Sequence, residues 1–375
     1  MTQFRSPRLL QMLFCGLTFT IWCSCGNRPA ERSFLQADNP IPVAVVGVGV
    51  FGRNHARVYQ ELERQGEAVR LVGVVDSDLN RADAVAREFG CRAFGSVKQM
   101  LTTHSEIRAA SVAAPTVHHL AVARALMQKG VDVLIEKPLA ASLAEADELV
   151  QLAAAHKRIA QAGHLERFNP AVRATIPLLT QPMFFEVHRL SVFTPRSLDV
   201  DVVLDLMIHD LDIVLSFANS PVKEVRAVGL PILSGKVDIA NVRLEFASGC
   251  VANFTASRVS TERVRKLRFF QPQQYVSVDY GRQEVLVFTV GADDGADSGA
   301  PTVNPQIKVA KPPVTSEEPL HAELKSFLHA VRQRSTPVVP LEDGRRSLAL
   351  ALDVIAAIRE HGKKVGVAGL AKAKG

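Results

Sequence analysis

Cysteine is scarce in this chain of 375 residues. Its five cysteines are Cys15, Cys23, Cys25, Cys91 and Cys250, and three of them fall within the first 25 residues. None of them has the spacing of a zinc-binding pattern, so we expect no metal site. The other two lie far apart in sequence, and this low content suits a reducing compartment, where disulfides are rare.

A basic excess is also missing from the body of the chain. The formal net charge is +6, but residues 1–40 contribute +2 and residues 362–375 contribute +4, which leaves about zero for residues 41–361. Nucleic-acid binding requires a clustered basic face, so we expect no nucleic-acid partner. A hydrophobic content of 47% with 22% charged residues is ordinary for a soluble globular protein, and the length favours two domains.

Residues 1–40 form an N-terminal extension whose apolar run, behind Arg5 and Arg8, has the length of a signal peptide. Trp22 and two cysteines stand where a cleavage site prefers small residues, and no arginine pair indicates twin-arginine export. A signal, a membrane anchor and a start codon placed too far upstream are therefore all open. We favour the last, because the first convincing strand begins near Ile41.

From Ile41 onward, strands and helices alternate. Short apolar strands are predicted at "PVAVVGVGVFG", "VRLVGVVDSD", "IRAASVAAP", "VDVLIEKP" and "IAQAGHL", with helical runs between them such as "HHLAVARALMQKG". Another helix, "SLAEADELVQLAAAHK", opens with a capping box from Ser142 to Glu145. This alternation predicts an α/β fold, a Rossmann-type doubly wound parallel sheet over residues 41–165.

The second half of the chain has a different sequence pattern, in which predicted strands are joined by short turns. Strands are predicted at "MFFEVHRLSVF", "VKEVRAVGL", "VDIANVRLEFA", "CVANFTASRVS", "KLRFFQ", "YVSVDY" and "EVLVFTV". They indicate an α+β domain with a mostly antiparallel sheet over residues 166–319, which ends in a long Gly/Pro/Asp-rich loop at residues 291–319. Helices at residues 320–361 close the body, and residues 362–375 form a basic tail.

The segment "GVGVFG" places Gly47, Gly49 and Gly52 directly after an apolar strand and before a helix. In this context three glycines typically allow a tight turn, a close approach of pyrophosphate and close helix packing in a dinucleotide site. Asp76 ends the next strand, where a carboxylate could bind the adenosine ribose hydroxyls and would repel a 2′-phosphate. We therefore expect NAD rather than NADP, although Arg81 is close enough to weaken that preference. A nucleotide cofactor also indicates the cytoplasm.

Two further segments follow later strands, at the edge where doubly wound sheets bind ligands. In "AAPTVHH", Pro115 would turn the chain over the cofactor and Thr116 or His119 could cap the next helix, and by itself the segment is more typical of a structural role than of a catalytic one. In "LIEKP", Lys137 could contact the nicotinamide ribose and a substrate hydroxyl, with a surface ion pair as the alternative, and Pro138 could follow a cis bond. The expected cofactor-binding residues are Gly47, Gly49, Val50, Phe51, Gly52, Asp76, Arg81, Ala114, Pro115, His119, Glu136 and Lys137.

Two more segments carry polar groups in apolar surroundings. In "GHLERFNP", Arg167 and Asn169 are candidates for substrate binding, with helix capping by Asn169 as the alternative. The run "VVLDLMIHDLDIVL" predicts a buried helix on which Asp205, His209 and Asp212 share one stripe. Ionisable groups resist burial unless they are paired or in use. The stripe is therefore either an internal network or the wall of a pocket, while the neighbouring Asp210 has no explanation.

Together these motifs resemble the Gfo/Idh/MocA oxidoreductase family over roughly residues 41–361. The likeness rests on the glycine fingerprint, "APTVHH", "EKP", "GHLERFNP", "DLMIHDLD" and the closing "VVPLEDGRRSLALAL". It implies a Rossmann domain followed by an open-faced sheet domain, with NAD or NADP between them. It also implies Lys137 as the active-site lysine and a D-x-x-x-H motif at Asp205 and His209, so that the stripe faces the nicotinamide cleft. Relatives often carry glycines where "LDVDVV" precedes this motif, which leaves the entry to the helix open.

The helical run and "VDIANVRLEFASGCVANFTASRVS" also resemble a narrower group, the UDP-N-acetylglucosamine 3-dehydrogenases that precede an aminotransferase in lipid A synthesis. We therefore expect NAD-dependent oxidation of a sugar 3-hydroxyl to a 3-keto sugar. His209, oriented by Asp205, would accept the hydroxyl proton, while Lys137 would donate a hydrogen bond to the oxygen. A diphosphate would be bound by a guanidinium group from Arg167, Arg189 or Arg196.

Other interpretations remain open on the same fold. The substrate could be another sugar, an inositol or a reduced tetrapyrrole, or the chain could be a non-catalytic regulator that senses nicotinamide nucleotides. The presence of Lys137, Asp205 and His209 argues against the regulator. By analogy with this architecture, we expect a homo-oligomer that forms through the sheet of the second domain.

Overall fold

The computed structural model describes residues 39–194, 200–291 and 306–366. The predicted N-terminal extension, Arg196, much of the predicted long loop and most of the basic tail lie outside these ranges. Within them, no helix combines the length and the apolar character needed to span a membrane.

The first sheet is parallel throughout, as the alternation of strands and helices predicts. Its strand order is β3-β2-β1-β4-β5-β6. The strands are β1 (Ile41–Val46), β2 (Val69–Val75), β3 (Arg92–Phe94), β4 (Ala109–Val112), β5 (Asp132–Glu136) and β6 (Ala160–Gly163). The order reverses between β1 and β4, and a doubly wound sheet binds its ligand beyond the carboxyl ends of such a pair.

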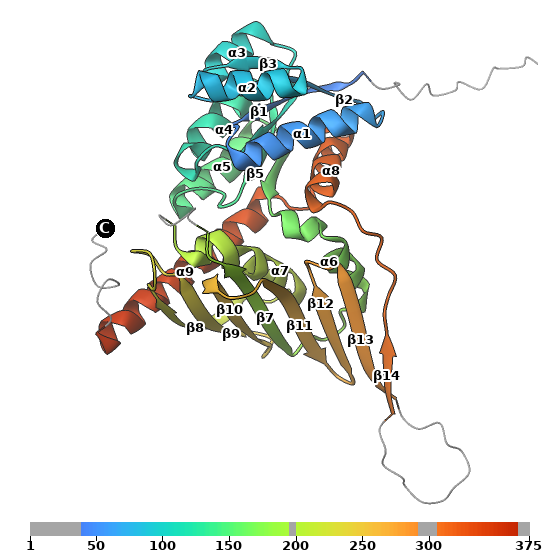
Figure 1. Cartoon of the computed structure of the whole chain (residues 1–375), viewed down its shortest axis with the longest axis vertical. Coiled ribbons are helices and arrows are strands. Elements are labelled where there is room, and N and C mark those ends of the chain that lie inside the picture. The colour runs from blue at the N-terminus through green and yellow to red at the C-terminus, as the bar shows by residue number, and fades with distance from the viewer. Residues whose placement is uncertain (1–38, 195–199, 292–305, 367–375) are drawn as a thin grey trace, which may run out of the picture. The chain divides into compact units, whose positions relative to one another are not determined.

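Helices connect these strands on both faces of the first sheet (Figure 1). They are α1 (Val50–Arg64), α2 (Leu79–Phe89), α3 (Val97–Thr103), α4 (His119–Gln128) and α5 (Leu143–Ala155), with short 3₁₀ turns η1 (Thr116–His118) and η2 (Leu165–Phe168). Half of the predicted capping box is present, because Ser142 Oγ accepts from Glu145 N at 3.2 Å, while Glu145 Oε2 accepts from the N–H of Ala141, one residue before the cap, at 3.0 Å. The short strand β3 and helix α3 were not predicted. Three residues in β3 are too few for a period-2 pattern, and the seven residues of α3 span only about two helical turns.

The second sheet is mostly antiparallel, which confirms the predicted fold class. Its order is β14-β13-β12-β11-β7-β10-β9-β8, and the pair β7–β10 is parallel. The strands are β7 (Phe184–Val192), β8 (Val222–Leu230), β9 (Ile239–Phe246), β10 (Val251–Ser260), β11 (Val264–Gln271), β12 (Gln274–Asp279), β13 (Glu284–Gly291) and β14 (Gln306–Ala310). Strand β14 corrects the prediction of a structureless loop at residues 291–319, because part of that segment pairs with β13.

Helices cover one face of the second sheet (Figure 1). They are α6 (Pro170–Thr175) with the 3₁₀ turn η3 (Ile176–Leu178), a π-helical turn η4 (Val203–Met207) that continues into α7 (Ile208–Ala218), and α9 (Leu341–Val365). Helix α8 (Pro319–Gln333) instead packs beside α1 on the first sheet. The π-helical turn is a departure from the regular helix that the sequence predicts, and it changes which side chains align across residues 203–209.

Helix α9 fixes the two sheets relative to each other. A Cβ atom added to Gly344 on α9 would lie 2.7 Å from the Cβ of Ala162 on β6, so the helix backbone approaches the first sheet closely. Farther along, Ile358 packs against Gly229 of β8, where an added Cβ atom would lie 3.0 Å from Ile358 Cγ2. The described residues from Pro40 onward belong to one compact unit, and groups from both modules can meet at a defined distance.

Candidate active site

In the glycine segment after β1, two positions have no room for a side chain. Gly47 has φ +85°, and a Cβ atom there would lie 2.4 Å from Ala114 N. A Cβ atom on Gly52 would lie 1.8 Å from Gly47 O, so helix α1 can pack against this turn because Gly52 lacks one. At Gly49, by contrast, nothing in the described structure lies within 4 Å of such an atom. The start of α1 is therefore open, and its N–H groups suit an anionic pyrophosphate.

A cavity of about 550 Å³ lies along this turn at the carboxyl ends of β1, β2 and β4. It is lined by most of the predicted cofactor-binding residues, namely Gly47, Gly49, Val50, Phe51, Asp76, Arg81, Ala114 and Pro115. His119 does not line it, and His118 does. The ring nitrogens of His119 instead contact the carbonyl oxygens of Ala114 at 2.8 Å and Leu139 at 3.2 Å, which gives this buried histidine a structural role beneath the cleft.

Asp76 supports the glycine turn as well as lining the cleft. Its Oδ2 accepts from Val48 N at 3.0 Å and its Oδ1 accepts from Asp78 N at 3.0 Å. The guanidinium of Arg81 lies 3.3 Å from Asp76 Oδ2. A carboxylate at the ribose end of the cleft is therefore already in place, with a cation beside it, and these residues fit a nicotinamide dinucleotide.

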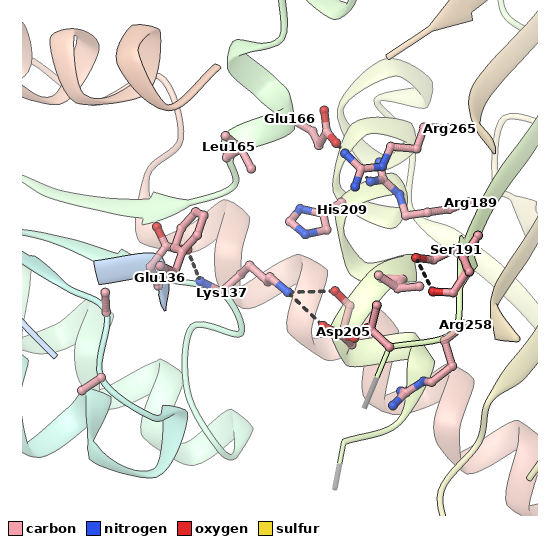
Figure 2. A pocket seen from close by; sticks show the side chains of 16 residues that line it. Glu136, Lys137, Leu165, Glu166, Arg189, Ser191, Asp205, His209, Arg258 and Arg265 are labelled. Carbon is pink, nitrogen blue, oxygen red and sulfur yellow. Dashed lines mark hydrogen bonds and ion pairs between the residues drawn. The ribbon is translucent and has the colours of Figure 1, made fainter. Parts of the chain in front are cut away.

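A second cavity, of about 390 Å³, lies between the two modules (Figure 2). Phe51, Ala113 and Ala114 line both cavities, so the dinucleotide cleft continues into this one. The first module contributes the predicted residues Glu136 and Lys137, and the second module contributes Asp205, His209 and Arg189. The structure thus brings the three predicted catalytic side chains to the wall of one cavity.

Lys137 reaches across from the end of β5 to the start of the helical run. Its Nζ donates to the backbone carbonyl of Asp205 at 2.8 Å and lies 3.8 Å from Asp205 Oδ1 (Figure 2). Burial lowers the pKa of Lys137, while the carboxylates of Asp205 and Glu136 oppose that shift. The Lys137–Pro138 peptide is cis, which the sequence had suggested. Glu136 itself is buried and is held by His55 Nε2 at 3.0 Å.

His209 lines the same cavity, and one of its two ring nitrogens makes no hydrogen bond with a described residue. Its Nδ1 atom is buried and has no hydrogen-bond partner among the described residues. Burial and, next, the positive charges of Lys137 and Arg189 hold the pKa of His209 well below its ordinary value. The ring is therefore neutral at pH 7 and able to accept a proton.

The contacts of Asp205 differ from the predicted ones. Sequence spacing suggested that Asp205 orients His209, but the described contacts of its side chain and carbonyl are with Lys137. The physical reason is the π-helical turn over Val203–Met207, because residues four apart no longer align through such a turn. Asp205 is thus placed to position the ammonium group rather than the imidazole.

Arg189 and the unexplained Asp210 form a buried ion pair. Arg189 Nε donates to Asp210 Oδ2 at 2.6 Å and Nη2 donates to Oδ1 at 2.9 Å, while Nη1 donates to Glu166 Oε1 at 3.0 Å. The guanidinium also lies 5.4 Å from the ring centre of Tyr280. Arg189 was expected to bind substrate, but two carboxylates already occupy its donors, which makes it part of the cavity wall.

The other residues of the "GHLERFNP" segment are also committed to internal contacts. Arg167 Nε donates to Asp212 Oδ2 at 2.6 Å, and its Nη2 donates to Asp343 Oδ2 at 3.1 Å. Neither Arg167 nor Asp212 lines the central cavity, so the stripe predicted to include Asp212 is divided between a pocket and a network. Asn169 caps α6 by accepting from Ala171 N at 3.1 Å, which is the alternative that the sequence had left open.

Sequence reasoning missed several residues that line the central cavity. They come from β7 and its continuation and from β10 and β11, and they are Ser191, Thr194, Arg258 and Arg265. The signal was present in β11, where Leu267 and Phe269 are buried at alternate positions and Arg265 continues that register. The strand itself was predicted from Lys266 onward, so this arginine fell just outside it.

A glycine turn that opens on a dinucleotide-sized cleft, joined to a cavity with a lysine and a neutral histidine, defines a nicotinamide-dependent oxidoreductase. The family models agree with this class: residues 41–164 match an oxidoreductase family with an NAD-binding Rossmann fold, and residues 182–274 match the GFO/IDH/MocA C-terminal domain. The chain belongs to the GFO/IDH/MocA oxidoreductase family, as the sequence motifs predicted.

Individual relatives extend this comparison. The chain is 38% identical over 316 residues to UDP-N-acetylglucosamine 3-dehydrogenase of Acidithiobacillus ferrooxidans, an alignment that covers 84% of this chain and 96% of the relative. A solved structure of that enzyme superposes with a TM-score of 0.76 and 35% identity, over 85% of this chain and 98% of the other. The scyllo-inositol 2-dehydrogenase (NAD⁺) of Bacillus subtilis is 26% identical over 60% of this chain and 69% of its own length.

The buried pair of Arg167 and Asp212 yields a prediction about stability. Changing Asp212→Asn should lower the free energy of unfolding by about 3–5 kcal/mol, because it leaves a largely buried guanidinium without its main partner. Urea denaturation would measure this difference. The matched control is Asp147→Asn, which removes the exposed ion pair with Arg345 and should change the free energy of unfolding far less, because solvent screens exposed charges. Equal unfolding free energies for the two variants would contradict the prediction.

Proposed function

We propose that the chain oxidises the 3-hydroxyl of UDP-N-acetylglucosamine to a 3-keto sugar with NAD⁺ as the oxidant. The observation that carries this proposal is the meeting of Lys137 and His209 at a cavity continuous with the dinucleotide cleft. The substrate is suggested by the identity with the Acidithiobacillus enzyme, which extends over both modules. A 3-keto sugar is a substrate for transamination, which is consistent with a step ahead of a 3-amino sugar in a lipid A type pathway.

In this proposal His209 is the general base. Its neutral imidazole takes the proton of the sugar hydroxyl as the oxygen gains carbonyl character. Lys137 donates a hydrogen bond to the same oxygen, and Asp205 holds the ammonium group in place through its carbonyl oxygen and carboxylate. NAD⁺, when bound, supplies the hydride-accepting chemistry, while the protein supplies position and charge.

Asp76 supports NAD over NADP as the cofactor. Its carboxylate lies in the ribose part of the cleft, where it can accept hydrogen bonds from the adenosine ribose hydroxyls and would repel a 2′-phosphate. The guanidinium of Arg81 lies 3.3 Å from the same carboxylate. Asp76 therefore partly neutralises the positive charge of Arg81, which makes Arg81 less available to a 2′-phosphate. We infer a cytoplasmic enzyme, because nucleotide cofactors and nucleotide sugars are both held there.

The substrate is tested by offering the purified chain several alcohols with NAD⁺ and following NADH absorbance. We expect turnover with UDP-N-acetylglucosamine, slower turnover when NADP⁺ replaces NAD⁺, and little with free N-acetylglucosamine or with inositols. Turnover of inositol alone would favour the inositol dehydrogenases among its relatives and contradict the proposed substrate. NADH binding without turnover of any sugar, inositol or reduced tetrapyrrole would indicate a regulator instead.

The role of His209 makes a prediction about pH. The base must be deprotonated and Lys137 protonated, so kcat/KM should fall at low and at high pH. The pKa of His209 lies well below 6.5. Activity should therefore persist as the pH falls through 6.5 and be lost only in more acidic solution, where the imidazole becomes protonated. Because the pKa of Lys137 is lowered from 10.5, the alkaline loss should begin below that value.

Substitution of His209 separates this role from a structural one. His209→Asn should reduce kcat by roughly 10²–10⁴-fold and remove the acidic limb of the pH profile, with unchanged NADH binding by fluorescence titration. His361→Asn, on the exposed part of α9, is the matched control and should leave both measurements unaltered. Near-normal turnover by the His209 variant would remove this residue from the base role.

We also propose that two copies associate through the uncovered face of the second sheet. An aromatic row crosses β7, β11, β12 and β13 on that face, formed by Phe184, Phe270, Tyr275 and Phe288. Phe270→Asp should lower the mass measured by sedimentation velocity, because a charge in an apolar interface is costly. Ile232→Asp, an exposed site away from this row, is the control. A monomeric mass for the unaltered chain would contradict the proposal.

A further inference from the structure

A third cavity, of about 430 Å³, adjoins the central one at the ends of β11 and β12. Its walls come from the turn before β11, from β11 itself and from the turn after β12. Arg265 lines both this cavity and the central one. The central cavity therefore shares residues of the first module with the dinucleotide cleft and Arg265 of the second module with this third cavity.

The third cavity is rich in positive charge. Its lining includes four cationic side chains, Arg263, Arg265, Lys266 and Arg282, and two acidic ones, Glu262 and Asp279. Asp279 is already engaged, because its Oδ1 accepts from the backbone N–H groups of Gly281 and Arg282 at 3.0 Å each. The cavity thus has an excess of cations over acids, although the body of the chain as a whole is close to neutral.

Arg265 stands directly opposite Arg189 across the antiparallel pair of β11 and β7. Like charges in such a position repel each other unless they are compensated. The carboxylates of Asp210 and Glu166 bond to Arg189, whereas no hydrogen bond or ion pair joins the guanidinium of Arg265 to any described residue. Figure 2 shows the side chain of Arg265 beside those of Arg189 and Glu166, across from His209.

The electrostatic environment of Arg265 favours an anionic ligand. Arg265 is an exposed residue, but its guanidinium is partly desolvated, and this partial burial and, next, the charge of Arg189 lower its pKa more than Glu166 and Asp210 raise it. A phosphate group would neutralise this charge and use the planar donors of the guanidinium, which match phosphate oxygens in pairs. Arg265 is therefore poised for a ligand in a way that the paired Arg167 and Arg189 are not.

We propose that Arg265, together with Arg263 and Arg282, binds the diphosphate of a nucleotide-sugar substrate. This inference rests on the proposed function and assigns the binding role that the sequence had given to Arg167, Arg189 or Arg196. The sugar then occupies the central cavity between Lys137 and His209, and the nucleotide extends away from NAD through the third cavity. Arg265 determines specificity by distinguishing a nucleotide sugar from a free sugar.

The test compares Arg265→Gln with Arg226→Gln in the full-length chain. Arg226 lies on edge strand β8, four strands away in the same sheet, and its described partner is the exposed Glu224. Arg265→Gln should raise the KM for UDP-N-acetylglucosamine and the inhibition constants of UDP and inorganic pyrophosphate by on the order of tenfold or more. NADH binding should stay near that of the unaltered chain, and Arg226→Gln should change none of these values.

A conservative variant guards against simple misfolding. Arg265→Lys should recover part of the UDP affinity, because it keeps the charge and loses the paired donors. An unchanged inhibition constant for UDP in Arg265→Gln, or an equal loss of NADH binding, would overturn the site.

Failure of the proposed function has a different signature, because the unaltered chain itself would not oxidise the nucleotide sugar. Titration calorimetry with UDP then still decides the site: binding weakened by Arg265→Gln supports it, and absence of binding to the unaltered chain overturns it.

Discussion

The hydrogen bond from Lys137 Nζ to the backbone carbonyl of Asp205 is the contact on which the site depends. It joins the end of β5 in the first sheet to the π-helical turn that precedes α7 in the second module. A backbone carbonyl does not titrate, so it holds the ammonium group at any pH at which the lysine is protonated. The neighbouring carboxylate, 3.8 Å away, adds the charge that keeps a partly buried ammonium protonated.

The distances across this contact are set by packing elsewhere. Helix α9 approaches β6 at Gly344 and contacts β8 through Ile358, so one helix contacts both sheets at close range. The pair of Arg167 and Asp212 adds a charged link, since Arg167 lies in η2 directly after the first sheet and Asp212 lies on α7. Ser347 of α9 donates to the same Asp212 at 2.9 Å. Charge pairing and close packing therefore act at the same junction.

Much of this arrangement was predictable because the strands and the ligand edge have local signatures. The glycine turn, the strand ends at Asp76 and Lys137, and the antiparallel character of the second sheet follow from short patterns. The partners of the buried aspartates do not, because Asp210 pairs with Arg189 and Asp212 with Arg167 over separations of 21 and 45 residues. The π-helical turn is likewise invisible to a regular period of 3.6 residues, so the expected contact between Asp205 and His209 was wrong in detail.

The distribution of charge around the central cavity explains why the histidine and the arginine next to it suit different tasks. Positive groups surround His209, and they lower its pKa together with burial, so the imidazole begins each cycle neutral. The same field that disfavours a second cation at His209 favours an anion at Arg265, where no described residue forms a hydrogen bond or ion pair with the guanidinium. An oxygen that becomes more negative as its proton leaves is stabilised by that field too. One cluster of cations can thus keep the base free, attract an anionic substrate and stabilise the developing charge.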